Sequence, residues 1–363
     1  MTVKEICSQF VTNAEYLYEE EVSIGIINRT YKVVYKGKDK EEAYIVQRIN
    51  KSVFNNPPRL MDNIVSVSKF LCDKVENKGL DTDKYVLKPL FAKDGKSYIV
   101  DEEEHFWRCY IFVPNSITYN STTDLSIIEK AGFAFGKFQD DLDGFDAKSL
   151  YETIPNFHNT ISRYDNLKKA IKEDVCGRAS GVKDEIEKYL ALEEKACLIT
   201  KYLQDGSLPL RVTHNDTKAN NICFDKDTHE ALAVLDLDTI MPGAIAFDYG
   251  DAIRFIGNTL IEDDPNYDAI DVDMTKYEAF TKGFVSAVKD SLTPLEKQTL
   301  NLGAFTMTTE CGVRFLTDYL SGDTYFKTKY AEHNLVRAKN QLTYATKILE
   351  NFDKMEAIMK KYF

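Results

Sequence analysis

The spacing of hydrophobic residues changes near residue 114, and this change limits the folds that are open to the chain. Before it, β-branched and aromatic residues dominate the runs 22–35, 43–49 and 107–113, and the first two runs predict a hairpin. Between the second and third runs, Leu60, Ile64, Val67 and Leu71 recur at helical spacing and predict one helix. After about residue 124, hydrophobic residues recur every three or four positions, as they do in helices with one buried face. The sequence therefore predicts an α+β protein with a small β-rich N-terminal lobe, residues 1–113, and a large, mainly helical C-terminal lobe, residues 114–363.

Composition argues against one class of partner. The 363 residues carry 46 Lys and Arg against 58 Asp and Glu, a net charge of −12. This balance argues against nucleic acid, whose phosphates need a concentrated basic surface. It leaves open a small phosphate-bearing ligand, since a metal ion can bridge an acidic protein and an anion.

The sequence also indicates where the protein works. No apolar run approaches the ~20 residues of a membrane span, and the N-terminal residues lack the pattern of a signal peptide. The seven cysteines are scattered and form no C-x-x-C pair, which favours free thiols in a reducing compartment. We expect a cytoplasmic protein without a membrane or nucleic-acid partner; its oligomeric state is not readable from the sequence.

The segment 211–238 carries the strongest chemical signal. Asp216 is followed five residues later by Asn221, and two apolar runs then flank a polar turn at 225–229. This pattern predicts a β-hairpin folded about its middle, with Asn221 opposite Asp236 and with Asp216 on the preceding loop.

These three residues match the parts of a kinase site. Magnesium takes one or two protein oxygen ligands together with substrate phosphates, and Asn221 and Asp236 can supply them. Kinases also place an Asp near the attacking hydroxyl, five residues before the metal-binding Asn, as Asp216 is placed. Asn and Asp are common in ordinary turns as well, but the whole conjunction is much rarer. We expect His214 to brace the loop by hydrogen bonds rather than to transfer protons.

The pattern at 214–221 and 236 resembles the aminoglycoside phosphotransferase/choline kinase family, which has a bilobal, protein-kinase-like fold. Longer strings resemble one branch of that family, the N-acetylhexosamine 1-kinases. These strings lie at 208–218, 236–243, 310–316, 318–320, 322–323, 325–326 and 332–337.

The resemblance implies an enzyme that moves the ATP γ-phosphate onto the anomeric hydroxyl of GlcNAc or GalNAc. It makes Asp216 the catalytic base and assigns magnesium to Asn221 and Asp236. It also places Arg314 and Tyr325 at the border of the sugar pocket, although the residues alone are equally compatible with packing and ion pairing.

The nucleotide side departs from the pattern of many relatives, which carry a Lys on the third strand. Here Gln47 and Arg48 stand in that strand and point to opposite faces, so either one is a candidate for the phosphates. Asp62 on the next helix is a candidate partner for Arg48. Phe112 and Val113 are expected to form the hinge that binds adenine through the backbone.

Two further departures bear on the acceptor. Ile26 replaces a His of the sugar kinases, and Ala43 replaces a basic residue. A site built around a hydrogen bond discriminates strongly by that bond, so the acceptor stays open. The alternatives are a related kinase acting on another sugar, inositol, an amino alcohol or an aminoglycoside, and a pseudokinase without turnover. The acidic run 262–264 hints at a cationic acceptor, or is a solvated loop.

Overall fold

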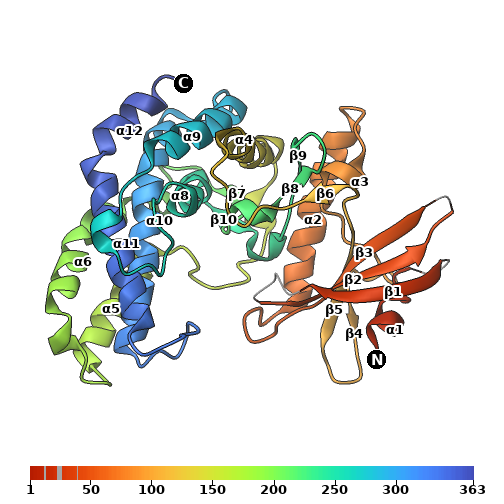
Figure 1. Cartoon of the computed structure of the whole chain (residues 1–363), viewed down its shortest axis with the longest axis horizontal. Coiled ribbons are helices and arrows are strands. Elements are labelled where there is room, and N and C mark those ends of the chain that lie inside the picture. Colours follow the sequence, from red (N-terminus) through yellow and green to blue (C-terminus); the bar gives the residue numbers. More distant parts are fainter. Residues whose placement is uncertain (12–13, 23–26, 39) are drawn as a thin grey trace. The chain divides into compact units, whose positions relative to one another are not determined.

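Figure 1 presents the computed structural model of the chain, which describes residues 1–11, 14–22, 27–38 and 40–363. Its contacts divide these residues into two compact units. Two later segments join the N-terminal residues in unit 1, so the units do not follow a single cut in the chain. Unit 1 comprises 1–118, 144–155 and 221–242, and unit 2 comprises 119–143, 156–220 and 243–363.

The main sheet of unit 1 is antiparallel, with the strand order β1-β2-β3-β5-β4. β2 and β3 pair in unbroken register, which confirms the predicted hairpin. Val33 and Val46 are buried beside Ile6 of α1, because β-branched side chains pack well on a pleated surface. The bounds are β1 (Glu15–Val22), β2 (Arg29–Lys36), β3 (Glu41–Arg48), β4 (Ile99–Val100) and β5 (Phe106–Ile111).

The helices of unit 1 begin at side-chain caps. Thr2 and Glu5 form a capping box at α1, and Asn56 caps α2 just before two prolines. α2 buries Leu60, Ile64 and other members of the predicted stripe. The bounds are α1 (Val3–Cys7), α2 (Pro57–Glu76), α3 (Thr82–Tyr85) and the 3-10 turn η1 (Ala147–Ser149).

A second, smaller sheet of unit 1 has the order β6-β8-β9 and contains the predicted hairpin of 211–238. Its strands are β6 (Ser116–Ile117), β8 (Ile222–Asp225) and β9 (Ala231–Val234). The 3-10 turn η3 (Ala219–Asn221) precedes β8, and η4 (Leu237–Thr239) and the short strand β10 (Met241–Gly243) follow β9.

Unit 2 consists mainly of helices, coloured olive to blue in Figure 1. They are α4 (Leu125–Asp141), α5 (Thr160–Glu173), α6 (Lys183–Ala196), α7 (Leu198–Gln204), α8 (Ile245–Ile256), α9 (Met274–Val288), α10 (Pro294–Leu320), α11 (His333–Glu350) and α12 (Phe352–Met359). The strand β7 (Arg211–Thr213) and the turns η2 (Ala179–Gly181) and η5 (Tyr267–Ala269) complete the unit.

α10 forms the centre of unit 2 and packs against α5, α8 and α11. It is buried on nearly all sides, which explains why its sequence shows little amphipathic contrast. α4 and α9 also pack closely, and Gly283 makes this possible because it has no side chain. A Cβ at this position would lie 1.9 Å from the Glu129 carbonyl oxygen. Among the residues that the structure describes, no helix is both long enough and apolar enough to span a membrane.

Candidate active site

Asn221 and Asp236 lie at the open end of the β8–β9 hairpin in unit 1. Leu235 N–H donates to the Asn221 carbonyl at 2.8 Å, so Asn221 stands opposite Leu235, and Asp236 is the next residue. Asp236 is exposed and adopts a left-handed backbone conformation, with φ 55° and ψ 64°, which Asp tolerates better than most residues. The hairpin therefore brings one carboxamide and one carboxylate to the same end.

The predicted register, with Asn221 directly opposite Asp236, is wrong by one residue. The turn closes where Asp225 N–H donates to the Glu230 carbonyl, about one residue earlier than the predicted centre. A bulge between Ile222 and Phe224 compensates for only part of this shift.

The donor set at this end of the hairpin fits magnesium. Two oxygen-bearing side chains leave most of the coordination sphere to water and phosphate, as magnesium prefers. Within the described ranges, no three His, Cys, Asp or Glu side chains gather into a group that could hold a metal by themselves. This donor set differs from the His- and Cys-rich sets of zinc sites.

A buried charge network lies on one face of the main sheet of unit 1. Arg108 of β5 is 1% exposed and places Nη1 2.5 Å from Asp238 Oδ1. Its Nε and Nη2 donate to Gln47 Oε1 at 3.0 and 2.9 Å. Asn28 Nδ2 donates to the other oxygen of Asp238 at 2.7 Å. Arg108 was absent from the predicted site, because in the sequence it is one polar residue within a strand-like run.

The pKa of Arg108 reflects this surrounding. Burial works to lower it, but the charge of Asp238, with smaller contributions that include Asp236, outweighs burial and holds the pKa above its ordinary value. The guanidinium therefore stays charged, and both carboxylates lie within its electrostatic reach.

The network distinguishes Gln47 from Arg48, the two residues of β3 that are candidates for contact with the phosphates. Gln47 pairs with Arg108 across the ladder and lies on the face of Asp238, donating to Thr30 at 3.0 Å. Arg48 is one residue on and therefore lies on the opposite face, together with buried Val46. Asp62 is exposed on α2, and no ion pair links it to Arg48 among the described residues.

The candidate hinge follows β5. Phe112 N–H donates to the Ala43 carbonyl at 3.1 Å, and the Val113 carbonyl accepts from the Ser116 hydroxyl at 2.7 Å. The Phe112 carbonyl and the Val113 N–H have no hydrogen-bond partner in the described part of the chain. These two groups are available for an adenine ring. Ile26, the predicted acceptor-side departure, lies outside the described residues.

Asp216 lies in unit 2, on the loop between β7 and η3. Lys218 Nζ is 2.6 Å from Asp216 Oδ1. Burial lowers the pKa of Lys218, but the charge and hydrogen bond of Asp216 outweigh it, so the pKa of Lys218 is raised overall. Lys218 is a further residue beside the predicted base that the sequence analysis did not single out.

Two carboxylates of α8 hold the backbone of this loop. Asp248 accepts the N–H groups of His214 and Asn215, each at 2.8 Å, and Asp251 accepts that of Thr217 at 3.1 Å. Burial raises the pKa of Asp248, while these hydrogen bonds and the nearby His214 oppose the rise. The carboxylates replace the ladder bonds that an irregular buried backbone lacks.

His214 has the bracing role that the sequence predicts. It is fully buried between the rings of Phe135 and Phe138, with centroids 5.9 Å away in each case. Its Nδ1 accepts the N–H of Asp216 at 3.3 Å. This bond helps to fix the backbone from which the Asp216 carboxylate projects.

Arg314 and Tyr325 line one cavity of about 330 Å³ in unit 2, together with Arg163. Arg314 stacks on Tyr325 and Phe326, with its guanidinium carbon 5.9 and 5.3 Å from the ring centroids. Tyr325 is 69% exposed. Burial, and next the charge of Arg314, lower the pKa of Arg163.

Asp318 shapes the rim of this cavity, and the sequence analysis did not assign it a role. One carboxylate oxygen accepts the N–H groups of Thr324 and Tyr325, and the other accepts that of Phe326, all at 2.9 Å. Asn334 donates to the same carboxylate. Asp318 thereby fixes the loop that carries Tyr325. The signal available in the sequence was an Asp near the end of a buried helix, six residues before Thr324.

Comparisons with known proteins show which family and which fold the chain resembles. A family model described as "Phosphotransferase enzyme family" (APH) matches residues 19–279. An aminoglycoside phosphotransferase from Alicyclobacillus acidocaldarius matches with a TM-score of 0.59 and 10% identity, over 99% of this chain and 97% of that one.

Two further solved structures cover 96% of this chain and 98% of their own. Choline kinase LicA from Streptococcus pneumoniae matches with a TM-score of 0.50 and 14% identity. Spectinomycin phosphotransferase APH(9)-Ia, in complex with ADP and spectinomycin, matches with a TM-score of 0.53 and 14% identity. At these identities the likeness is one of fold, and it confirms the predicted α+β, protein-kinase-like class.

Proposed function

Because the chain belongs to the phosphotransferase enzyme family, of the aminoglycoside phosphotransferase/choline kinase type, we propose that it transfers the γ-phosphate of ATP to the anomeric hydroxyl of an N-acetylhexosamine. The observation that carries this choice of acceptor is the cavity that joins Arg314 and Tyr325. The sugar-kinase-like strings in the sequence had marked both residues for the acceptor.

The cavity favours a small acceptor. Its volume of about 330 Å³ is near the lower end of the ~300–1,000 Å³ typical of ligand sites. Guanidinium and phenol groups beside stacked rings suit a sugar, which offers both apolar C–H faces and hydroxyl groups.

The acidic run 262–264 gives little support to a cationic acceptor. Glu262 lies 2.6 Å from Arg254, and Asp263 lies 3.1 Å from Lys329. These carboxylates already have cationic partners, so an uncharged sugar is preferred to an amino alcohol.

Asn221 and Asp236 are the residues that would hold magnesium. The ion would neutralise charge on the transferred phosphoryl group. Gln47, and the backbone of Phe112 and Val113, are the proposed nucleotide contacts, since Arg48 lies on the other face of β3.

Asp216 is the proposed base. It accepts the proton of the acceptor hydroxyl as that oxygen forms a bond to the γ-phosphorus. The bond between the γ-phosphorus and the β–γ bridging oxygen breaks, and ADP leaves with that oxygen. Lys218 and the bonds from α8 orient Asp216 for this step.

The test is an ADP-release assay with Mg²⁺ and ATP against GlcNAc, GalNAc, other hexoses, inositol, choline and aminoglycosides. We expect turnover with the N-acetylhexosamines. The methyl glycosides are the matched controls, because they lack only the free anomeric hydroxyl. Phosphorus NMR should show the product phosphate coupled to the anomeric proton.

Equal ADP release with the methyl glycosides would contradict the anomeric site. Faster turnover of inositol, choline or an aminoglycoside would identify a different acceptor, and the protein would still be a kinase. Absence of turnover with every acceptor, despite nucleotide binding, would indicate a pseudokinase.

A further inference from the structure

In protein kinases a Lys on strand three pairs with a Glu on the following helix, and this pair must be in place for catalysis. Here β3 carries Arg48 and α2 carries Asp62, but no ion pair joins them among the described residues. Strand β3 offers Gln47 on the face of the magnesium segment, and α2 offers the exposed Asp62 and the buried Asn63. The segment after Asp236 is instead contacted by a buried ion pair on the main sheet.

We propose that the buried Arg108–Asp238 ion pair positions Asp236 for magnesium. The inference rests on the proposed function in one respect, that Asp236 is a magnesium ligand. It makes Arg108 and Asp238 positioning residues, since they act through Asp236.

The geometry of Arg108 suits this role. Its guanidinium fork uses one edge for Gln47 and turns Nη1 to Asp238, so its orientation is fixed at both ends. Asp238 uses both oxygens, one for Arg108 and one for Asn28. Asp238 lies within η4, two residues after Asp236, so holding Asp238 limits how far Asp236 can move.

Helix α2 supports the same segment through a neutral side chain. Asn63 Nδ2 donates to the Ile240 carbonyl at 3.1 Å and to the Tyr151 carbonyl at 2.8 Å, and Asn63 Oδ1 accepts the Tyr151 N–H at 2.9 Å. α2 thus contacts the segment after Asp236 through the Asn63 amide and the backbone of Ile240, not through a charged side chain. The ionic contact with this segment comes from Arg108.

Burial makes the choice of variants important. Removing one partner of a buried ion pair leaves an uncompensated charge and endangers folding, whereas removing both charges is often tolerated. The test variant is therefore the double substitution Arg108→Met with Asp238→Asn. Arg108→Lys keeps the cation. Asn28→Ala, at a half-buried position, removes one hydrogen bond to Asp238 and one from the Asn50 N–H.

The measurement is the affinity for ADP with and without Mg²⁺, by calorimetry on the full chain. Residues that orient metal ligands typically contribute about 10- to 100-fold to metal affinity. We expect the double variant to lose about tenfold in Mg²⁺-dependent ADP affinity and to keep its metal-free ADP affinity. Asn28→Ala should lose a smaller part, and Arg108→Lys, which keeps the charge but not the fork, should also keep part of the affinity.

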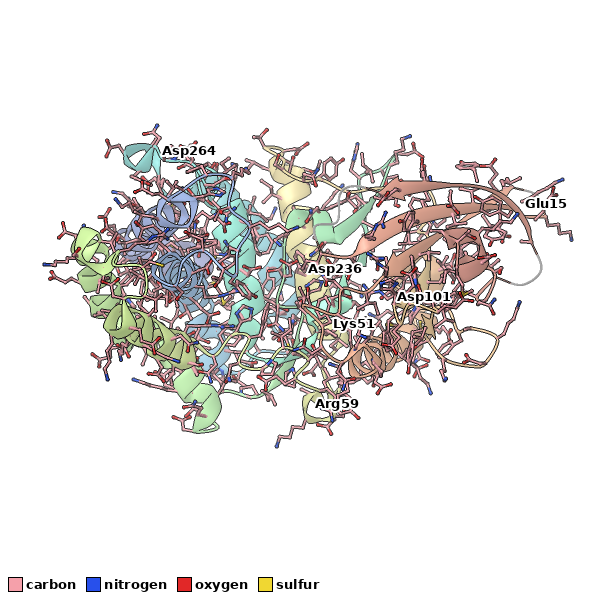
Figure 2. The ribbon with its side chains drawn as sticks, turned by 90° about the horizontal axis from the view of Figure 1, so that it is seen from below. Glu15, Lys51, Arg59, Asp101, Asp236 and Asp264 are labelled. Carbon is pink, nitrogen blue, oxygen red and sulfur yellow. The ribbon has the colours of Figure 1, made fainter. Side chains whose placement is uncertain are left out.

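The control is Asp101→Asn, which removes another carboxylate of unit 1, the one between β4 and β5 that contacts Trp107 and His105. Asp101 and Asp236 are both labelled in Figure 2. Wild-type Mg²⁺-ADP affinity in the folded double variant, or in Asn28→Ala if the double variant does not fold, overturns the inference.

Asp236→Ala separates this result from the proposed function. If Asp236→Ala abolishes the Mg²⁺ dependence while the Arg108 variants keep it, only the positioning role is lost. If Asp236→Ala also keeps it, the magnesium assignment fails and the inference fails with it.

Discussion

Asp216 and Lys218 form an ion pair, with 2.6 Å between the carboxylate and the ammonium group. The pair fixes the side chain that we propose as the base. Asp216→Asn should keep the fold and the KM for ATP but lower kcat by about 10²–10⁴-fold, the usual contribution of general base catalysis. Steady-state kinetics measure both quantities. Asp290→Asn, an exposed carboxylate of unit 2, is the control, and near-wild-type kcat in Asp216→Asn would disprove the role.

Asp236→Ala should abolish the Mg²⁺ dependence of ADP binding, because it removes the only carboxylate of the proposed pair of ligands. A calorimetric titration of ADP at increasing Mg²⁺ checks this. Asp227→Ala in the exposed turn of the same hairpin provides the control. An unchanged magnesium titration would count against the assignment.

Asp248→Ala should destabilise the protein by about 3 kcal/mol. It leaves the buried N–H groups of His214 and Asn215 and the amide of Gln139 without their acceptor, and each such group costs about 1–3 kcal/mol. Urea unfolding gives the free energy of unfolding, with Asp290→Ala as reference. A loss below about 1 kcal/mol would mean that Asp248 does not hold the loop in solution.

Arg314→Met should raise the KM for the acceptor by about 10- to 100-fold, which corresponds to losing a hydrogen bond from a charged group. The KM for ATP should not change. Arg59→Met is a matched control, because Arg59 also stacks on a ring, that of Tyr151, but lies in unit 1. Equal effects on both KM values would place Arg314 outside the acceptor site.

The lowered pKa of Asp101 leads us to expect that the free energy of unfolding depends on pH. Burial raises its pKa, but hydrogen bonds from Trp107 and from the backbone of His105 and Glu103 outweigh burial and lower the pKa to about 2. A carboxyl group with a lowered pKa stabilises the folded state above its unfolded pKa of about 3.9, and this contribution is lost as the pH falls towards 2.

Wild type should therefore exceed Asp101→Asn in free energy of unfolding by about 1 kcal/mol at pH 7, after allowance for solvent screening. The two should converge near pH 2. Denaturant unfolding at both pH values tests this, and a difference that does not change with pH would refute it.

The sequence predicted the fold class because its signals are local. Alternating β-branched residues marked β2 and β3, and the helical stripe at Leu60 and Ile64 marked α2. β1 was missed because its side chains are mostly exposed and largely Glu, so no buried face appears in its pattern. β1 is a strand because its backbone pairs with that of β2, and the side-chain pattern does not show this pairing.

The candidate site was predicted only where one short segment carries it. Asp216, Asn221 and Asp236 lie within 21 residues, so their spacing is visible in the sequence. Arg108 and Asp238 are 130 residues apart, and only the sheet brings them together. Asp318 acts on the backbone of Tyr325, which no side-chain pattern encodes. The hairpin register failed by one residue because bulges leave little trace in a sequence.

The segment after Asp236 is held by the sheet through Arg108 and by α2 through Asn63. In protein kinases the corresponding segment can turn over, and the packing of the residue after the metal-binding Asp distinguishes active from inactive enzyme. Turning it over here would leave a buried guanidinium without its counter-ion, at a cost of several kcal/mol. An on–off switch of that kind would therefore have to break a buried ion pair in this chain.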